Sequence, residues 1–250
     1  TDSNSMQKEF PNSVILCNIA GASNAGLMQF EAAIESYKNA LRIMPNYADA
    51  YYNMAIILND NKDPEAAIES YKQAIKIKPD FAEPYINMGI ILKDKGDPEA
   101  AINCFKQAIK IKPDFAEAQY NLGTIYHNVG QLNNAREFYS KAIAIKNDYP
   151  IAHNNLGQIL LELGKLDNAI KHFELAISFN SNFAEAHNNL GVAHQQLRKF
   201  DESIKCYKKA LMINPSYAQA LNNLGIVYQT LGDKNSAINY YKEAISIKED

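Results

Sequence analysis

Apolar and small residues recur along the chain at the spacing of amphipathic helices. In AEAQYNLGTIYHNVG, residues 116–130, they lie three and four positions apart, and the segment ends near a glycine, so it predicts one helix. A second helix is predicted to open at Asp63-Pro64-Glu65, with an apolar stripe of Ile68, Tyr71 and Ile75. Both kinds of segment alternate along the chain, which predicts consecutive helix pairs.

Start and stop signals flank the second helix of each pair. In Asp63-Pro64-Glu65 and Asp97-Pro98-Glu99, the aspartate can cap the helix, proline suits its first position, and glutamate favours the positive end of its dipole. A proline then ends the helix, because its ring and missing N–H prevent continuation. These prolines are Pro45, Pro79, Pro113 and Pro215. Asn147 and Ser181 stand in their place in the fourth and fifth pairs, where the turns have weaker signals.

The helix pair repeats every 34 residues without insertion or deletion. One column is always alanine: Ala40, Ala74, Ala108, Ala142, Ala176, Ala210 and Ala244. An aromatic column lies three places earlier: Tyr37, Tyr71, Phe105, Tyr139, Phe173, Tyr207 and Tyr241. A column of small residues comprises Gly21, Ala55, Gly89, Gly123, Gly157, Gly191 and Gly225. Small residues let paired helices approach closely, and the aromatic ring fills the space beside them.

One helix pair leaves an apolar face uncovered, so neighbouring pairs are expected to stack into an all-α solenoid. The pattern N-L-G-x-x-Y…G…A-x-x-x-Y/F-x-x-A…P resembles the tetratricopeptide repeat, and the resemblance covers residues 14–250. It implies a right-handed α-solenoid of seven helix-turn-helix units, with first helices on the concave face and second helices on the convex face. The units are expected to start near residues 14, 48, 82, 116, 150, 184 and 218.

Both ends of the array are expected to be open. Residues 1–13 align with the tail of a preceding partial repeat, with Met6 on the alanine column and Pro11 on the proline column. After Lys248-Glu249-Asp250 no polar capping helix follows, although solenoids normally need one for solubility. We therefore expect the chain to be a fragment of a longer protein, and its ends to favour end-to-end self-association at high concentration.

An asparagine column is the most informative candidate site. Only Ile19 interrupts it, and its members are Asn53, Asn87, Asn121, Asn155, Asn189 and Asn223. An asparagine amide both donates and accepts hydrogen bonds, so a row of them can hold the backbone of an extended peptide. The alternative is that these amides bond to neighbouring helices and fix the spacing of the repeats. Asparagine has poor helix propensity, so either role would explain its recurrence.

The adjacent column varies along the chain: Asn18, Tyr52, Ile86, Tyr120, Asn154, Asn188 and Asn222. The groove is therefore predicted to be aromatic and apolar in repeats two to four and doubly amidic in repeats five to seven. The predicted peptide-binding set is the asparagine column with Tyr52, Tyr120, Asn154, Asn188 and Asn222. Side-chain selectivity is expected from the half between Tyr52 and Tyr120, where pockets can desolvate an anchor.

The asparagine column also resembles the ladder in the repeat regions of O-linked N-acetylglucosamine transferases and their relatives. That resemblance implies that the chain is the substrate-recognition region of a larger glycosyl- or sulfotransferase, although no segment resembles the catalytic domain. A self-associating scaffold that recruits partners to its surfaces is the alternative. The carboxylate clamp known in other tetratricopeptide proteins is absent, because the clamp's lysine positions hold Asp49, Glu83, Glu117 and Glu185. These acids give the groove a negative rim.

Composition narrows the function classes further. The 250 residues are 47% hydrophobic and 21% charged, and 25 basic against 28 acidic residues give a net charge of −3, which argues against a nucleic-acid partner. No apolar run is long enough to predict a membrane span, and the N-terminal residues TDSNSMQKEFPNS lack the basic-then-apolar order of a signal peptide. The three cysteines (Cys17, Cys104 and Cys206) fit a reducing cytoplasm.

Candidate chemistry for catalysis or metal binding is sparse. The five histidines are interpreted as packing residues, because none has a partner at metal-ligand spacing: His127, His153, His172, His187 and His194. No phosphate-binding loop, nucleophile elbow or dinucleotide fingerprint occurs. We therefore expect no catalytic residue, no metal and no cofactor.

Overall fold

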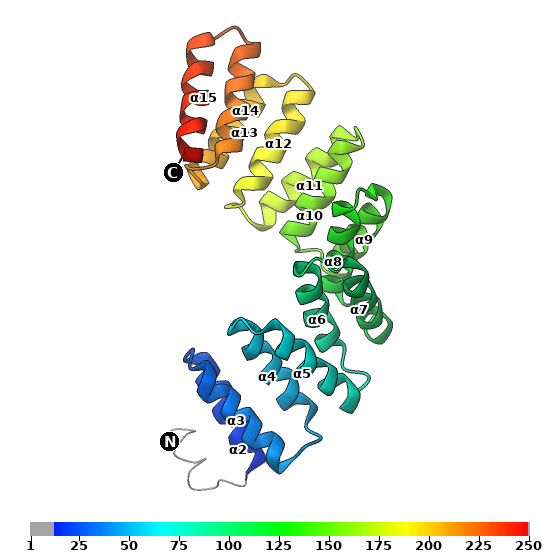
Figure 1. The fold of residues 1–250 in the computed structure, drawn as a ribbon. Coiled ribbons are helices and arrows are strands. Elements are labelled where there is room, and N and C mark those ends of the chain that lie inside the picture. Colours follow the sequence, from blue (N-terminus) through cyan, green and yellow to red (C-terminus); the bar gives the residue numbers. More distant parts are fainter. Residues whose placement is uncertain (1–12, 250) are drawn as a thin grey trace. The chain divides into compact units, whose positions relative to one another are not determined.

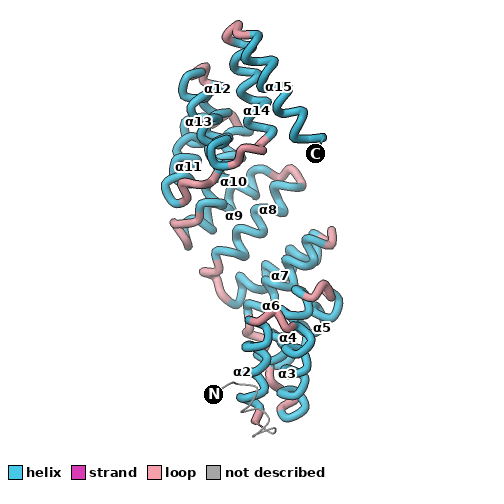
Figure 2. The backbone as a smooth tube through the Cα atoms, turned by 90° about the vertical axis from the view of Figure 1, so that its left-hand side faces the viewer, coloured by secondary structure: helices cyan, strands magenta, loops and turns pink. Residues whose placement is uncertain are grey.

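The computed structural model describes residues 13–249, and its elements there are 14 α-helices. The alignment of Met6 and Pro11 with a preceding repeat lies outside the described residues. Short loops join the helices (Figure 2). The first helices of the pairs are α2 (Val14–Gly26), α4 (Ala48–Asp60), α6 (Ala82–Asp94), α8 (Ala116–Asn128), α10 (Pro150–Glu162), α12 (Ala184–Gln196) and α14 (Ala218–Thr230). The second helices are α3 (Phe30–Ile43), α5 (Pro64–Ile77), α7 (Pro98–Ile111), α9 (Leu132–Ile145), α11 (Leu166–Phe179), α13 (Phe200–Ile213) and α15 (Lys234–Glu249).

The chain divides into two compact units, Thr1–Asn121 (unit 1) and Leu122–Asp250 (unit 2). In unit 1 the pairs α2–α3, α4–α5 and α6–α7 pack together, α3 packs on α4, and α5 packs on α6 (Figure 1). The pairs α10–α11, α12–α13 and α14–α15 of unit 2 pack in the same way. This stacking confirms the predicted all-α fold of repeated helix pairs. No described helix has the length and apolarity that crossing a membrane would require.

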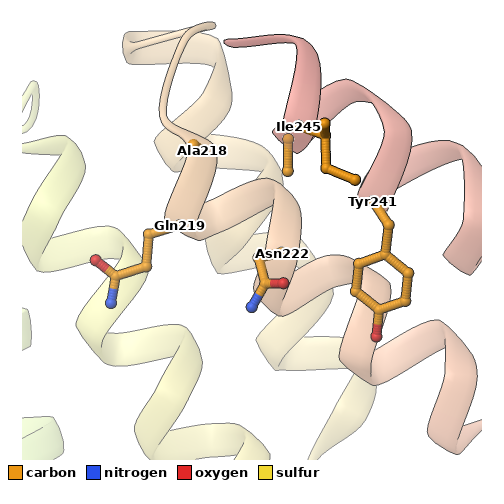
Figure 3. A pocket seen from close by; sticks show the side chains of 6 residues that line it. Ala218, Gln219, Asn222, Tyr241 and Ile245 are labelled. Atoms are coloured by element: carbon orange, nitrogen blue, oxygen red, sulfur yellow. The ribbon is translucent and has the colours of Figure 1, made fainter. Parts of the chain in front are cut away.

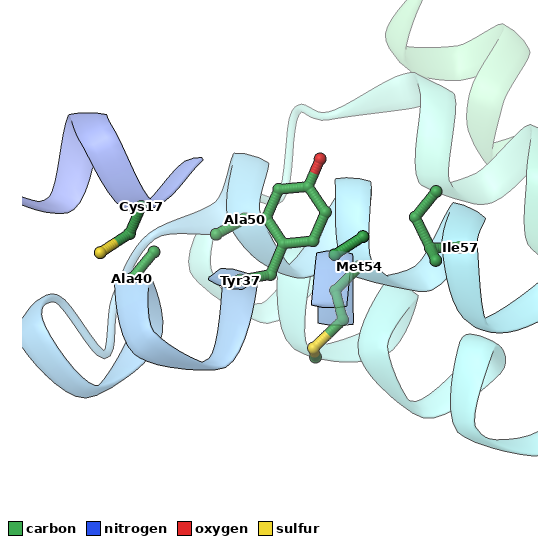
Figure 4. Close-up of a cluster of buried hydrophobic side chains, with 7 residues drawn as sticks. Cys17, Tyr37, Ala40, Ala50, Met54 and Ile57 are labelled. Carbon is green, nitrogen blue, oxygen red and sulfur yellow. The ribbon is translucent and has the colours of Figure 1, made fainter. Parts of the chain in front are cut away.

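The core of each pair is the contact between the small column and the aromatic column. Tyr37 is buried among Cys17, Ala40, Ala50 and Met54 (Figure 4). The glycines of the small column leave room for these rings: a Cβ added at Gly157 would lie 2.6 Å from Cε1 of Phe173. The close approach of the paired helices thus depends on a missing side chain, as the sequence pattern predicts.

The predicted helix starts are confirmed where the signals were strongest. The Asp63 side chain accepts a hydrogen bond from the backbone N–H of Ala66 at 3.1 Å, and that of Asp97 accepts one from Ala100 at 3.0 Å. Pro64 and Pro98 are the first residues of α5 and α7. Each aspartate therefore satisfies one of the N–H groups that lack a partner within the helix.

Histidines support the two turns that lack proline. His153 Nε2 donates to the carbonyl oxygen of Asn147 at 3.0 Å, and His187 Nε2 donates to that of Ser181 at 3.1 Å. A carbonyl oxygen can only accept, so each histidine carries its proton on Nε2 when neutral. Residues interpreted only as packing residues thus also fix the turns whose sequence signals were weak.

Candidate functional site

In unit 1 the asparagine column retains capacity to bind a ligand. Asn53 on α4 and Asn87 on α6 are both half-buried. Asn87 Nδ2 donates to Tyr52 Oη at 3.4 Å, and the structure gives no hydrogen bond between the Asn53 side chain and any described residue. Asn121 is buried; its Nδ2 donates to the carbonyl oxygen of Glu117 at 3.0 Å, and its Oδ1 accepts from Lys93 Nζ at 3.4 Å. Asn53 and Asn87 are therefore the members that a ligand can reach most easily here.

Tyr52 lies beside these amides, and its ring contacts two further aromatic rings. Its ring centroid is 5.0 Å from that of Phe81 and 5.9 Å from that of Tyr71. Burial is the main cause that raises the pKa of Tyr52; the hydrogen bond from Asn87 opposes this, and the charges of Glu83 and Glu117 raise the pKa further. Tyr120, the other predicted aromatic of this column, is half-buried on α8. The surface around Tyr52 thus combines an aromatic ring, an amide and negative charge, and we call Tyr52, Asn53, Asn87, Glu83 and Glu117 the ladder face.

In unit 2 the amides bond to each other. Asn223 Nδ2 donates to Asn188 Oδ1 at 3.0 Å, and Asn188 Nδ2 donates to Asn189 Oδ1 at 3.3 Å. Asn189 Nδ2 donates to Asn154 Oδ1 at 3.0 Å, and Asn154 Nδ2 lies 3.4 Å from Asn155 Oδ1. The two bonds between repeats, Asn223 to Asn188 and Asn189 to Asn154, each join residues 35 positions apart. The two columns therefore form a continuous amide network through three repeats.

Glu185 also forms a hydrogen bond with the Asn154 amide. Its Oε1 accepts from Asn154 Nδ2 at 3.0 Å, while Asn189, one helical turn further along α12, donates to Asn154 Oδ1. Both ends of one amide are thus bound by an acid and an amide spaced four residues apart on the neighbouring helix. Glu185, considered from sequence only as part of a negative rim, is also a structural partner.

Burial separates the predicted site residues of unit 2. Asn154 and Asn188 are 0% exposed and Asn189 is buried, so a ligand cannot touch them without displacing a helix. Asn155 and Asn223 are half-buried, and Asn222 is exposed. The sequence analysis considered bonds to neighbouring helices as the alternative role of the asparagine column, and in unit 2 Asn189 and Asn223 make such bonds. The partners of these bonds, Asn154 and Asn188, could not be identified from the residue types alone.

Two histidines of unit 2 form a hydrogen-bonded pair. His153 Nδ1 and His172 Nδ1 are 3.0 Å apart, and because His153 donates through Nε2, its Nδ1 accepts from His172. Burial, with smaller contributions from the charges of His153 and Lys171, lowers the pKa of His172 to about 4. Within the described residues no group of three or more potential metal ligands occurs. The pair is therefore neutral at pH 7 and holds α10 against α11.

The cysteines have the character of packing residues. All three are free thiols, and burial raises the pKa of Cys104 and of Cys206 to about 11. A thiol that ionises only at such high pH is a poor nucleophile at neutral pH. This chemistry gives no support to catalysis by Cys104 or Cys206.

Family comparisons agree with the repeat pattern. A TPR repeat family model matches residues 29–62, 89–130, 125–164 and 157–198. Two tetratricopeptide repeat models match residues 48–81 and 182–250. No curated protein matches the chain.

Solved structures share the fold. The crystal structure of MamA is 28% identical, covers 65% of this chain and 95% of its own, and has a TM-score of 0.60. YrrB, described as a TPR protein with an unusual peptide-binding site, is 24% identical over 73% of this chain and 94% of its own, with a TM-score of 0.62. The Cut9–Hcn1 structure from the APC/C is 18% identical over 99% of this chain and 49% of its own, with a TM-score of 0.71. Because the TPR repeat model alone matches more than half of the residues, the chain belongs to the tetratricopeptide repeat family.

Proposed function

We propose that this protein is a binding scaffold whose ladder face holds an extended segment of a partner protein. The observation that carries this proposal is the contrast between the units. Asn53 has no side-chain hydrogen bond to a described residue and Asn87 donates to the Tyr52 hydroxyl, whereas Asn189 and Asn223 of the same column each donate to an amide of the preceding repeat. The two roles considered for the column are thus divided: peptide contact in unit 1 and ordering of the repeats in unit 2.

The geometry suits an extended backbone. The bond from Asn87 to Tyr52 shows that α4 and α6 are neighbours, and packed helices lie ~8–10 Å apart. An extended peptide advances about 3.3 Å per residue, so two successive ladder asparagines would meet about every third residue. Each amide can accept from a peptide N–H and donate to a peptide C=O, which requires no particular side chain.

Charge favours a basic segment. Glu83 and Glu117 both act on the Tyr52 hydroxyl, so their negative charges lie near the aromatic ring of the ladder face. A lysine or arginine of the partner would find these carboxylates together with the Tyr52 ring, which attracts cations. Neutral or acidic segments would lose this attraction.

The wider context is also a proposal. The resemblance of the asparagine column to transferase ladders supports a substrate-recognition region of a larger glycosyl- or sulfotransferase. YrrB, the structural neighbour with a peptide-binding site, supports peptide binding by a similar repeat array. Finding a transferase domain in the parent gene would support the context; a parent without one would leave a scaffold that recruits partners.

The test is peptide binding with matched asparagine variants. The full chain is screened against an array of basic, neutral and acidic peptides, and hits are titrated by fluorescence anisotropy. The double variant Asn53→Ala/Asn87→Ala is expected to bind roughly 5- to 150-fold more weakly, because the loss of one net hydrogen bond of about 0.5–1.5 kcal/mol at each asparagine costs about 1–3 kcal/mol. Asn103→Ala, an exposed asparagine of α7, is the control and should bind normally.

Two results would count against the proposal. Equal affinity of the double variant and the unchanged chain would remove the ladder face from the site. Selection of acidic rather than basic peptides would contradict the charge argument. Self-association unaffected by the ladder variants, with no peptide bound, would instead favour the scaffold alternative.

A further inference from the structure

Two tyrosines hold the amide of Asn87 on the ladder face. Asn87 Nδ2 donates to Tyr52 Oη at 3.4 Å. Burial raises the pKa of Tyr71 to about 12, and a side-chain hydrogen bond with Asn87 opposes this rise. A hydrogen bond that lowers the pKa of a phenol is one that its oxygen accepts, because it stabilises the phenolate, so Asn87 is the donor here as well. An amide nitrogen carries two N–H groups, and Tyr52 and Tyr71 thus occupy both.

The contact between Tyr71 and Asn87 recurs at the same spacing in unit 2. Asn155 Nδ2 donates to Tyr139 Oη at 3.5 Å, and these two residues are 16 positions apart, as Tyr71 and Asn87 are. In both cases a tyrosine of the aromatic column accepts from the ladder asparagine of the next repeat. The contact therefore follows from the packing of successive repeats.

A tyrosine of the aromatic column can also bond within its own repeat. Tyr241 reaches from α15 to α14 (Figure 3), and its hydroxyl donates to Gln229 Oε1 at 2.8 Å. In the repeat of Tyr71, the position of Gln229 holds Asn59, whose side chain is shorter and exposed. The Tyr71 hydroxyl therefore remains available to Asn87.

The oxygen of the Asn87 amide remains for a ligand. Asn87 is half-buried, and its Oδ1 has no hydrogen-bond partner among the described residues. This oxygen is not enclosed by the protein, so a ligand can reach it. An isolated ladder amide can donate as well as accept, but Asn87 offers a partner only an acceptor.

Resting on the proposed function, we propose that Asn87 recognises a backbone N–H group of the partner segment, and that Tyr52 and Tyr71 fix this selectivity by holding both N–H groups of the amide. The residue of the segment that meets Asn87 cannot be proline, which has no backbone N–H. Asn53, whose side chain has no hydrogen bond to a described residue, can still donate or accept. Tyr71 is 2% exposed, so it acts as a positioning residue and does not touch the partner.

The test is an ester scan of the basic peptide selected from the array. Replacing one residue at a time by its α-hydroxy acid exchanges a backbone N–H for an oxygen and adds no bulk. Binding to the full chain is measured by fluorescence anisotropy. At one position the ester should weaken binding about fivefold or more, because the Asn87 oxygen then lacks a donor in the complex. Asn87→Ala should remove the penalty at that position and thereby identify it.

Tyrosine variants test the positioning role. Phe105 occupies the place of Tyr71 one repeat later and is 0% exposed, so Tyr71→Phe is expected to fold, which circular dichroism checks. In Tyr52→Phe/Tyr71→Phe the Asn87 amide can turn and present Nδ2 to the ester, so the penalty should fall below about twofold. Tyr71→Phe alone should give an intermediate penalty. Tyr207→Phe, which removes a hydroxyl of the same column in unit 2, is the control and should keep the full penalty.

The amide is also followed in the free chain by NMR with ¹⁵N-labelled asparagine, and Asn87→Ala assigns its signals. The Nδ2 protons of Asn87 should exchange with water more slowly than those of the exposed Asn103, and Tyr52→Phe/Tyr71→Phe should remove this difference. Equal exchange of Asn87 and Asn103 in the unchanged chain would overturn the inference.

Failure of this inference can be distinguished from failure of the proposed function. If peptide binding requires Asn53 and Asn87 but no ester penalty depends on Asn87, the ladder face stands and the inference is overturned. The same conclusion follows if Tyr52→Phe/Tyr71→Phe keeps the full penalty. If no peptide requires Asn53 and Asn87, the proposed function fails and this inference fails with it.

Discussion

Replacement of Asn188 by alanine tests the structural role of the amides in unit 2. Asn188 is 0% exposed, accepts from Asn223 Nδ2 at 3.0 Å and donates to Asn189 Oδ1 at 3.3 Å. Its loss leaves the buried Asn189 oxygen without that donor, at about 1–3 kcal/mol. Asn223 is half-buried, so water can replace part of its bond, at about 0.5 kcal/mol. Alanine has a better helix propensity than asparagine, which offsets about 0.6 kcal/mol of this loss. The free energy of unfolding should therefore fall by about 2 kcal/mol.

Asn222→Ala is the matched control, because Asn222 occupies the same column one repeat later and is exposed. It should be neutral or slightly stabilising. Both variants are unfolded in urea and followed by far-UV circular dichroism, and hydrogen exchange shows where the structure opens. In a repeat protein the loss should first appear around α12 to α14. Equal stability of the two variants would refute the claim that the amide network orders the repeats.

Three further predictions concern the same scaffold. Burial lowers the pKa of His172 in the folded chain to about 4, below its ordinary value of 6.5, so the unfolded chain is protonated first as the pH falls. The contribution of His172 to the free energy of unfolding should therefore be complete above pH 6.5 and decrease as the pH drops toward 4. His172→Phe should flatten this pH dependence when the free energy is measured by urea unfolding at several pH values. Lys62 has a φ of 62°, a backbone conformation that is strained for a residue with a side chain and unstrained for glycine. Lys62→Gly should therefore raise the free energy of unfolding by about 0.5–1 kcal/mol. An unchanged or lower urea midpoint would contradict this explanation. Phe173 is 0% exposed, so Phe173→Ala should lower the free energy of unfolding in urea by about 3–5 kcal/mol. Hydrogen exchange should show that α10 to α12 unfold before unit 1. Simultaneous loss of exchange protection in both units would contradict local unfolding.

The sequence predicts the fold because the same pattern of small, aromatic and capping residues recurs from repeat to repeat. The small column and the aromatic column specify the close contact of paired helices, as at Gly157 and Phe173, and the Asp63 and Asp97 caps specify where helices begin. At one turn position of the repeat, the residue type is a weaker guide to the backbone conformation. Gly96, Gly130, Gly164 and Gly232 have positive φ there, but Lys62 and Arg198 adopt the same conformation, so the stacked helices impose it without glycine.

The candidate site was less predictable, because an asparagine's role depends on a neighbour 35 residues away. Asn87 meets Tyr52 and stays partly exposed, whereas Asn189 meets Asn154 and is buried. The residue types of both columns are visible in the sequence, but a hydrogen bond between repeats requires the register of packed helices. The role of His153 and His187 in the turns after α9 and α11 was missed for a different reason: each partner is a backbone carbonyl only six residues earlier, and its direction depends on the path of the loop.

The most direct test of the account is hydrogen exchange of the full chain with and without a saturating basic peptide selected from the array. The account predicts slower exchange in α4 and α6, which carry Asn53 and Asn87, and loss of that protection in Asn53→Ala/Asn87→Ala at the same peptide concentration. Protection confined to the second helices α5 and α7, or protection that the double variant retains, would contradict the claim that the ladder face binds the partner.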